Sequence, residues 1–252
     1  MVMKRLAYLT FVLGLIFFCT VARKDTLSET LFIPVSTAKT LPFSEKIIEE
    51  ITAKPLTYLG NGCEAMAFSS HDNRYVLKLF FRREYHTKPK FDPIARFRQL
   101  TWKKMSERRN RHIANRYERA LQEIPELTGM LDFHRYVSIN QLPICTLIDS
   151  HGKSVVVDLN KLTFAIQAKG FVTDKEFLKA HREELDPKFT NFFTQMTEKG
   201  FVNIRRSFNP ANFALLDGNI IMIDIGELKY DPEKAHTSEK AYLEKRYLSH
   251  FN

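Results

Sequence analysis

The chain has 252 residues, of which 44% are hydrophobic, and its formal net charge is +9. This length and composition allow one full core, or two small lobes that share a cleft, and they exclude a chain that is disordered by composition. The three cysteines, Cys19, Cys63 and Cys145, are too few for a disulfide framework and lack a metal-binding spacing. A single disulfide bridge between Cys63 and Cys145 remains an alternative.

The first part of the chain has the pattern of a targeting segment. Residues 6–22 form 17 consecutive uncharged positions between two pairs of basic residues. This length is short for a membrane span and slightly long for the core of a signal peptide. We therefore interpret residues 1–24 as a signal peptide or membrane anchor, residues 25–43 as a linker, and the chain as exported or membrane-anchored. The topology stays open, because the basic residues are balanced on the two sides.

Three strand patterns follow the linker. Apolar runs occupy residues 55–59, 65–69 and 75–81, and residues 70–74 between the last two are rich in turn formers. These runs predict a three-stranded antiparallel meander.

The positive charge of the chain is concentrated in the next segment. From Arg82 to Arg119 there are 13 Lys and Arg against 4 Asp and Glu, which accounts for the whole net charge of +9. Apolar residues recur there at three- and four-residue steps, which predicts a long amphipathic helix, or a broken pair, closed by Pro125 and Gly129. The charge favours an acidic protein face, phosphates or anionic lipid headgroups as partner. The alternative is a helix face that is simply exposed to solvent. Nucleic acid ranks below these partners, because no recognisable DNA- or RNA-binding motif accompanies the charge.

The second half of the chain changes from strands to helices. Strand patterns occupy residues 130–137, 144–149, 154–159 and 162–168, and helical patterns occupy residues 174–184 and 187–199. The first helical pattern begins with Asp174 as its predicted cap. A final hairpin is predicted at residues 213–223, turning at Asp217-Gly218. Strands with one helix, followed by helices and a hairpin, predict the α+β class.

Two motifs in the first half have the chemistry of a phosphate site. Gly60, Asn61, Gly62 and Ala65 lie between two strands, and such small residues let backbone N–H groups approach phosphates closely. Lys78 lies in an otherwise apolar strand and therefore needs an anionic partner.

For that partner we favour Glu118 over Glu107 and Glu123. Glu107 has Arg111 four residues later, which is a ready local ion pair.

A third motif lies around the final hairpin. Asn212 and Asp224 bracket the predicted turn, so both oxygen-bearing side chains face one cleft if the hairpin forms. Magnesium prefers one or two carboxylates together with substrate phosphates, which suits this pair. The alternative is that Asn212 is an ordinary turn residue and Asp224 an ordinary strand exit.

Together these motifs resemble the protein-kinase family. The segment from Gly60 to Ala67 resembles the glycine-rich loop, Val76-Leu77-Lys78-Leu79 the strand with the phosphate-binding Lys, and Asn212 with Asp224-Ile225-Gly226 the metal-binding residues. The resemblance covers about residues 55–230. It implies a bilobal, minimal protein-kinase-like fold that binds ATP and Mg²⁺, with an antiparallel-sheet small lobe and its long helix at residues 44–170 and a shortened, mainly helical large lobe at residues 171–252.

The chain departs from the family at the catalytic loop. Ser207 stands where the catalytic Asp is expected, after Arg205 and Arg206, and only 28 residues follow Asp224. A serine has no comparable basicity near neutral pH. The leading hypothesis is therefore a kinase-like nucleotide-binding protein, a pseudokinase or regulatory module. The alternatives are an atypical ATP-dependent phosphotransferase, and an exported or membrane-anchored non-enzymatic binding protein with a basic anion-binding surface.

Overall fold

The structure is a computed structural model, and it describes residues 45–62, 64–80, 112–135, 142–203, 208–236 and 240–249. The chain divides into two compact units, Met1–Thr30 and Leu31–Asn252, and all described residues belong to the second. The predicted targeting segment and linker, most of the basic segment, Cys63 and residues 204–207 lie outside the described residues. Within the described ranges, no helix combines the length and the apolar character that a membrane crossing requires.

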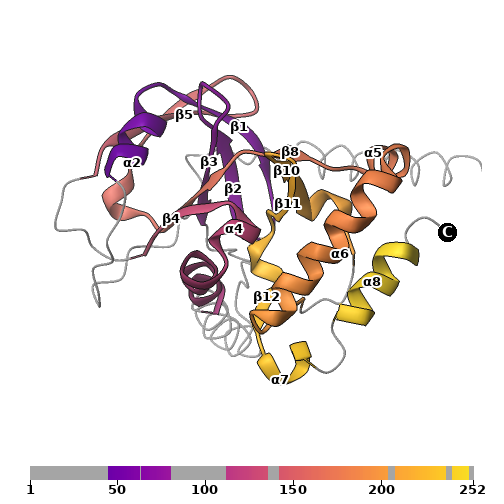
Figure 1. The fold of residues 1–252 in the computed structure, drawn as a ribbon. Coiled ribbons are helices and arrows are strands. Elements are labelled where there is room, and N and C mark those ends of the chain that lie inside the picture. The colour runs from indigo at the N-terminus through magenta and orange to yellow at the C-terminus, as the bar shows by residue number, and fades with distance from the viewer. Residues whose placement is uncertain are drawn as a thin grey trace, which may run out of the picture. The chain divides into compact units, whose positions relative to one another are not determined.

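A seven-stranded sheet forms the first part of the described fold (Figure 1), in the order β4-β7-β3-β2-β1-β5-β6. Its strands are β1 Leu56–Asn61, β2 Ala65–Ser69, β3 Tyr75–Phe80, β4 Met130–His134, β5 Ile144–Ile148, β6 Ser154–Asp158 and β7 Phe164–Ala168. The predicted antiparallel meander of β1, β2 and β3 is confirmed. All pairs in the sheet are antiparallel except β1 with β5, which are parallel.

Two smaller sheets follow in the chain. β8 (Phe171–Val172) and β11 (Asn219–Met222) flank β10 (Phe213–Leu216), and β9 (Phe201–Asn203) pairs with β12 (Leu228–Tyr230). The predicted hairpin is confirmed, because Leu216 pairs directly with Asn219 across a two-residue turn. Asp217 and Gly218 have φ angles of 49° and 78°, the left-handed geometry that such a tight turn requires.

Helices surround the smaller sheets and one precedes the large sheet. They are α2 Glu45–Thr52, a helix at residues 112–123, α4 Pro125–Thr128, α5 Lys175–Ala180, α6 Arg182–Glu198, α7 Pro232–Lys234 and α8 Lys240–Ser249. Single 3-10 turns, η2 Leu159–Lys161, η3 Pro210–Asn212 and η4 Ile225–Glu227, join strands. Gly129, with φ 62°, ends α4 in the left-handed conformation typical of helix C-termini.

The break between the two predicted helices lies earlier than expected. The sequence predicts a helix that starts at Pro187, whereas α6 begins at Arg182 and contains Pro187. The break is at His181, whose amide bonds to the Phe177 carbonyl at 3.1 Å and whose carbonyl accepts the Leu185 amide at 3.0 Å. Pro187 is the sixth residue of α6, beyond the first turn, so the helix continues through it at the cost of one backbone hydrogen bond. The predicted cap of α5 is confirmed, because the Asp174 carboxylate accepts the Phe177 amide at 2.7 Å.

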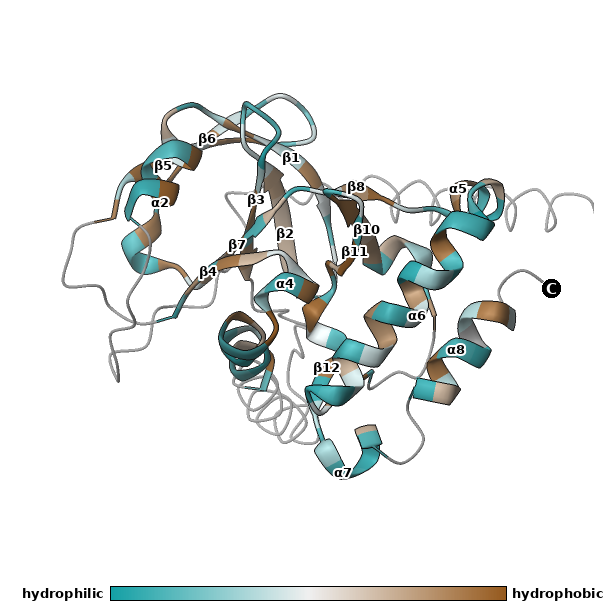
Figure 2. Cartoon of the chain, in the orientation of Figure 1, coloured by the Kyte–Doolittle hydropathy of each residue, from teal (hydrophilic) through white to brown (hydrophobic). Residues whose placement is uncertain are grey.

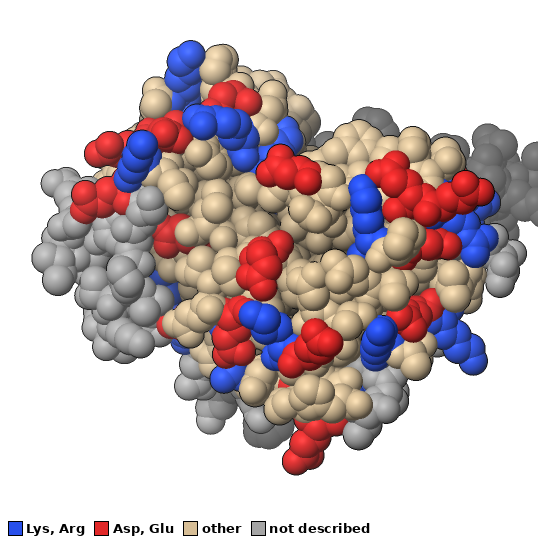
Figure 3. Space-filling view, in the orientation of Figure 1, with Lys and Arg blue, Asp and Glu red and all other residues tan. Residues whose placement is uncertain are grey.

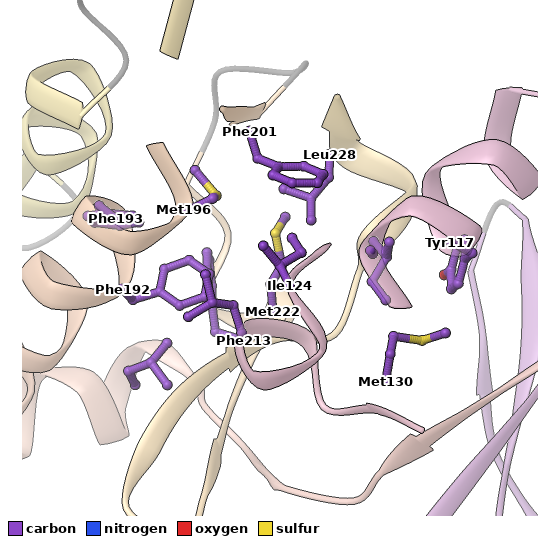
Figure 4. Packing of buried hydrophobic residues seen from close by; sticks show 14 of the residues in the cluster. Tyr117, Ile124, Met130, Phe192, Phe193, Met196, Phe201, Phe213, Met222 and Leu228 are labelled. Carbon is purple, nitrogen blue, oxygen red and sulfur yellow. The ribbon is translucent and has the colours of Figure 1, made fainter. Parts of the chain in front are cut away.

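One hydrophobic cluster joins residues from before and after position 170. It includes Tyr117, Ile124 and Met130, the α6 residues Phe192, Phe193 and Met196, and the strand residues Phe201, Phe213, Met222 and Leu228 (Figure 4). The rings of Phe192 and Phe213 lie 5.7 Å apart, edge to face. Apolar residues line β10 and β11, while polar residues alternate with apolar ones along α6 (Figure 2). The predicted α+β class is confirmed, and this shared core fixes the hairpin against the helix at residues 112–123.

Candidate functional site

Lys78 lies in the middle of β3, where the residue paired with it on each neighbouring strand is an alanine. Its Cα pairs with Ala67 on β2 and with Ala165 on β7. The ammonium group donates to the carbonyl oxygen of Ile223. Burial lowers the pKa of Lys78 to about 8, and the negative charge of Asp224 partly opposes this shift. The cation therefore lies directly at the chain segment that carries Asp224.

Asn212 and Asp224 are brought together by the hairpin between them. The β10–β11 ladder ends with the pair Phe213 and Met222, and one further bond from the Ile223 amide to the Asn212 carbonyl, 2.8 Å long, extends it. Asn212 thus lies opposite Ile223, which directly precedes Asp224 and accepts the bond from Lys78. The three predicted site residues Lys78, Asn212 and Asp224 meet around the backbone of Ile223.

The side-chain amide of Asn212 is held in place by two neighbours. Its nitrogen donates to the Glu227 carboxylate at 3.1 Å, and its oxygen accepts from the side-chain amide nitrogen of Asn209 at 3.3 Å. Asn212 and Glu227 are both buried. Glu227 was not predicted as a site residue, although its position three residues after Asp224 in a single turn was a usable signal.

Asn212 and Asp224 fit a magnesium ion, but they supply only a few of the ligands that it needs. The Asp224 carboxylate and the Asn212 amide oxygen are hard oxygen donors of the kind that Mg²⁺ takes. Across the described part of the chain, no group of three or more His, Cys, Asp and Glu side chains could hold a metal ion. A cation bound here would therefore depend on phosphate oxygens and water for its remaining ligands.

The loop before Asn212 is fixed by Thr173, which follows β8. The Thr173 hydroxyl donates to the Pro210 carbonyl at 2.8 Å, and its amide donates to the Phe213 carbonyl at 3.1 Å. Thr173 is fully buried, so these bonds are shielded from water. The position of Asn212 is therefore set by β8 as well as by its own hairpin.

The glycine-rich turn connects β1 and β2. Gly60 and Asn61 end β1, the register against β2 shifts between Tyr58 and Gly60, and the Gly62 amide bonds to the Ala65 carbonyl at 2.9 Å. A Cβ added to Gly60 would meet no atom within 4 Å. The turn is thus open on that side, and it offers the access to backbone groups that a phosphate needs. Ala65 starts β2, opposite Phe80.

Glu64 reaches from this turn to the segment after Asp224. A Cβ added to Gly226 would overlap the Glu64 carboxylate and would lie 3.5 Å from a carboxylate oxygen of Asp224. Burial raises the pKa of the nearby Tyr117, and the charges of Asp224 and Glu64 raise it further. Glu64 was not predicted as a site residue. An acidic side chain within a loop expected to face phosphates was the signal that could have identified it.

Glu118 differs from its predicted role. Its carboxylate pairs with Arg135 at 3.4 Å, and both side chains are largely buried. Glu123 pairs with Arg119 at 2.9 Å, and Glu107 lies outside the described residues. The negative charge of Asp224 raises the pKa of Lys78 against the effect of burial, and the Lys78 ammonium donates to the carbonyl of Ile223 directly before Asp224.

The helix at residues 112–123 supplies a cation to the site. Arg116 donates to the carbonyl oxygen of Gly226, two residues after Asp224. Arg116 was not predicted, because one arginine within a strongly basic segment has no distinctive spacing. Ser207, Arg205 and Arg206, at the predicted catalytic positions, lie outside the described residues.

Comparison with known proteins gives little further information. No family model and no curated protein matches the chain. Among solved structures, a crystal structure of WbdD is similar with 14% sequence identity and a TM-score of 0.39. The similarity covers 70% of this chain and 33% of that one, so the chain spans about a third of the WbdD structure.

Proposed function

We propose that the chain is a kinase-like nucleotide-binding protein that binds ATP together with Mg²⁺ and acts as a pseudokinase or regulatory module. The observation that carries this proposal is the meeting of Lys78, Asn212 and Asp224 around Ile223. Lys78 is far in the sequence from Asn212 and Asp224, and it was predicted from a motif separate from theirs. An ordinary turn and an unrelated strand lysine give no reason for such a meeting.

Each residue has a chemical role in the proposal. The Lys78 ammonium pairs with phosphate oxygens, and because its pKa is about 8 it is mainly charged at pH 7. The Asp224 carboxylate and the Asn212 amide oxygen hold Mg²⁺, which neutralises phosphate charge. The turn from Gly60 to Ala65 supplies backbone N–H groups to the phosphates. The proposal does not rely on Glu118, whose carboxylate pairs with Arg135.

Binding is proposed without turnover. With Ser207 at the position of the catalytic Asp, no residue of the predicted loop has the basicity to activate an acceptor hydroxyl. The alternative, an atypical phosphotransferase, predicts transfer of label from γ-labelled ATP. That label would be lost in Asp224→Ala, whereas a pseudokinase leaves parent and variant equally unlabelled.

Thermal unfolding of the full chain, with and without Mg-ATP, tests the binding proposal. Ligand at about a hundredfold excess over its Kd should raise the Tm of the parent by about 5–10 °C. Lys78→Met and Asp224→Asn should lose most of this shift, because each removes a charge that faces the phosphates or the cation. Lys153→Met and Asp231→Asn are matched controls on other surfaces and should keep it.

A parent without any shift from Mg-ATP would contradict the proposal. So would an Asp224→Asn variant that keeps the whole shift. Either result would favour the remaining alternative, a binding protein that uses its basic segment rather than a nucleotide site.

A further inference from the structure

Two cations from different elements bind the backbone on either side of Asp224. Lys78 on β3 donates to the carbonyl of Ile223, directly before Asp224. Arg116 on the helix at residues 112–123 donates to the carbonyl of Gly226, two residues after it. Hydrogen bonds from a charged donor are about twice as strong as neutral ones. A backbone carbonyl on each side of the proposed metal-binding carboxylate is thus held by a charged group.

The turn that these cations hold is a single 3-10 turn, in which the Leu228 amide bonds to the Ile225 carbonyl. Asp224 precedes the three-residue turn η4 without a side-chain cap, and the Glu227 amide reaches the Asp224 carbonyl only at 3.4 Å. A single 3-10 turn with a bond this long has weak hydrogen-bond geometry. The orientation of the Asp224 segment therefore depends on donors from outside it.

Arg116 is well placed to be such a donor, because its helix is anchored in the core. The neighbouring Tyr117 is buried, and its ring lies 4.7 Å from that of Phe80 on β3. Ile113 and Ala120, on adjacent turns, are also buried. The helix and β3 are thus packed together, which fixes Arg116 and Lys78 relative to each other.

Arg119, one turn later, has a different environment. Its guanidinium lies over the ring of Tyr230 at 4.0 Å and pairs with Glu123 at 2.9 Å. Arg119 therefore contacts the segment after Asp224 at β12 rather than at the turn. The helix offers an arginine of the same charge and length as a matched control.

We infer that Arg116 is a positioning residue, which together with Lys78 clamps the Asp224-Ile225-Gly226 turn and orients the Asp224 carboxylate toward the bound cation. The inference rests on the proposed function for its ligand, but the clamp itself is a property of the free protein. In this arrangement the helix is coupled to the cation site through an arginine and a backbone carbonyl. The glutamate–lysine pair predicted from the sequence is not needed for that coupling.

The first measurement needs no ligand. Hydrogen exchange of the full chain should be faster at the amides of Ile225, Gly226 and Glu227 in Arg116→Met than in the parent, by about tenfold for the loss of one charge-assisted bond. Arg119→Met should leave these amides at the parent rate. Arg116→Lys, which keeps the charge, should lie between the parent and Arg116→Met.

The second measurement uses Mg²⁺ titration at a fixed concentration of a fluorescent ATP analogue. Arg116→Met should raise the half-saturating Mg²⁺ concentration about tenfold, because a loosened Asp224 holds the cation less well. Arg119→Met should not change it. A purely structural role would lower the Tm of Arg116→Met without changing the Mg²⁺ requirement.

Equal exchange rates at these three amides in Arg116→Met and Arg119→Met would overturn the clamp. Faster exchange combined with an unchanged Mg²⁺ requirement would overturn the positioning role. A parent that binds no nucleotide at any Mg²⁺ concentration would refute the proposed function, and with it the orientation toward a cation. The exchange rates would then still decide whether the clamp exists.

Discussion

His134, the last residue of β4, is a buried ionisable side chain. The residue is 5% exposed, and its ring stacks on that of Phe164 at 4.9 Å. Burial lowers the pKa of His134 to about 4, because the charged imidazolium would lose its hydration. Between this value and the ordinary pKa near 6.5, the unfolded chain binds the proton and the folded chain does not. The folded state should therefore lose stability as the pH falls through this window.

The expected loss from His134 can be measured by urea unfolding at pH 7 and pH 5. The two pKa values correspond to a contribution of about 2 kcal/mol lost at pH 5. In His134→Gln the difference in unfolding free energy between the two pH values should shrink by about this amount. His71→Gln, in the exposed turn between β2 and β3, should behave as the parent. An equal pH dependence in all three proteins would contradict the assignment.

Site residues that belong to a local sequence motif could be predicted. Site residues whose role depends on contacts with distant parts of the chain could not. Lys78, Asn212 and Asp224 are each marked by an unusual local context, such as a lysine in an apolar strand. Arg116 and Glu64 act on Gly226, which is more than a hundred residues from either of them. No local pattern encodes such a contact, because it depends on how the helix and the glycine-rich turn pack against η4.

Gly170, between β7 and β8, shows how two elements constrain a single position. A Cβ there would lie 2.7 Å from the Leu215 carbonyl oxygen and 3.0 Å from the Ala214 Cβ. This crowding arises because the chain passes from β7 of the large sheet directly into β8, which pairs with β10. Backbone atoms cannot move aside as the end of a flexible side chain can.

Gly170→Ala should therefore destabilise the protein by about 1–3 kcal/mol, the usual range for overpacking. Gly60→Ala is the matched control, because its new Cβ would meet open space, and its effect should stay within about 0.5 kcal/mol. Urea unfolding of both variants measures the difference. Equal stability of the two variants would show that β8 and β10 separate readily at this point.

Elements with local signals were predicted well, and pairings between distant segments were not. The turn at Asp217-Gly218 and the cap at Asp174 depend on neighbouring residues, and both are confirmed. The parallel pairing of β1 with β5 joins segments about 90 residues apart, and the pairing of β9 with β12 about 25. Alternation of side chains predicts that a strand exists, but it does not specify the partner of that strand.

At the scale of the molecule, the charge is unevenly distributed along the chain. The segment from Arg82 to Arg119 carries the whole surplus of +9, and the remaining residues are balanced. Figure 3 agrees, since acidic and basic side chains are interspersed on the face that it shows. Attraction to an anionic partner is therefore expected from this one segment.

Binding of the full chain to vesicles tests this expectation. Vesicles with anionic headgroups should bind the protein at 50 mM salt and lose it largely at 300 mM, since screening shortens the range of the attraction. A double variant, Arg108→Glu with Arg109→Glu, should bind much more weakly. The matched control, Lys153→Glu with Lys175→Glu, changes the net charge equally and should bind more strongly than the first. Equal binding of the two variants would mean that net charge, not this segment, is responsible.

The pairing of β3 with β7 has a consequence for synthesis on the ribosome. Phe164, the start of β7, lies 84 residues further along the chain than Phe80, the end of β3. At about 5–20 residues per second, the ribosome needs about 4–17 seconds to add these residues. During that interval β3, with its apolar residues Leu77 and Leu79, is a strand edge without its native neighbour, the kind of edge on which other chains aggregate. The nascent protein should therefore depend on chaperones most strongly before residue 168 leaves the ribosome.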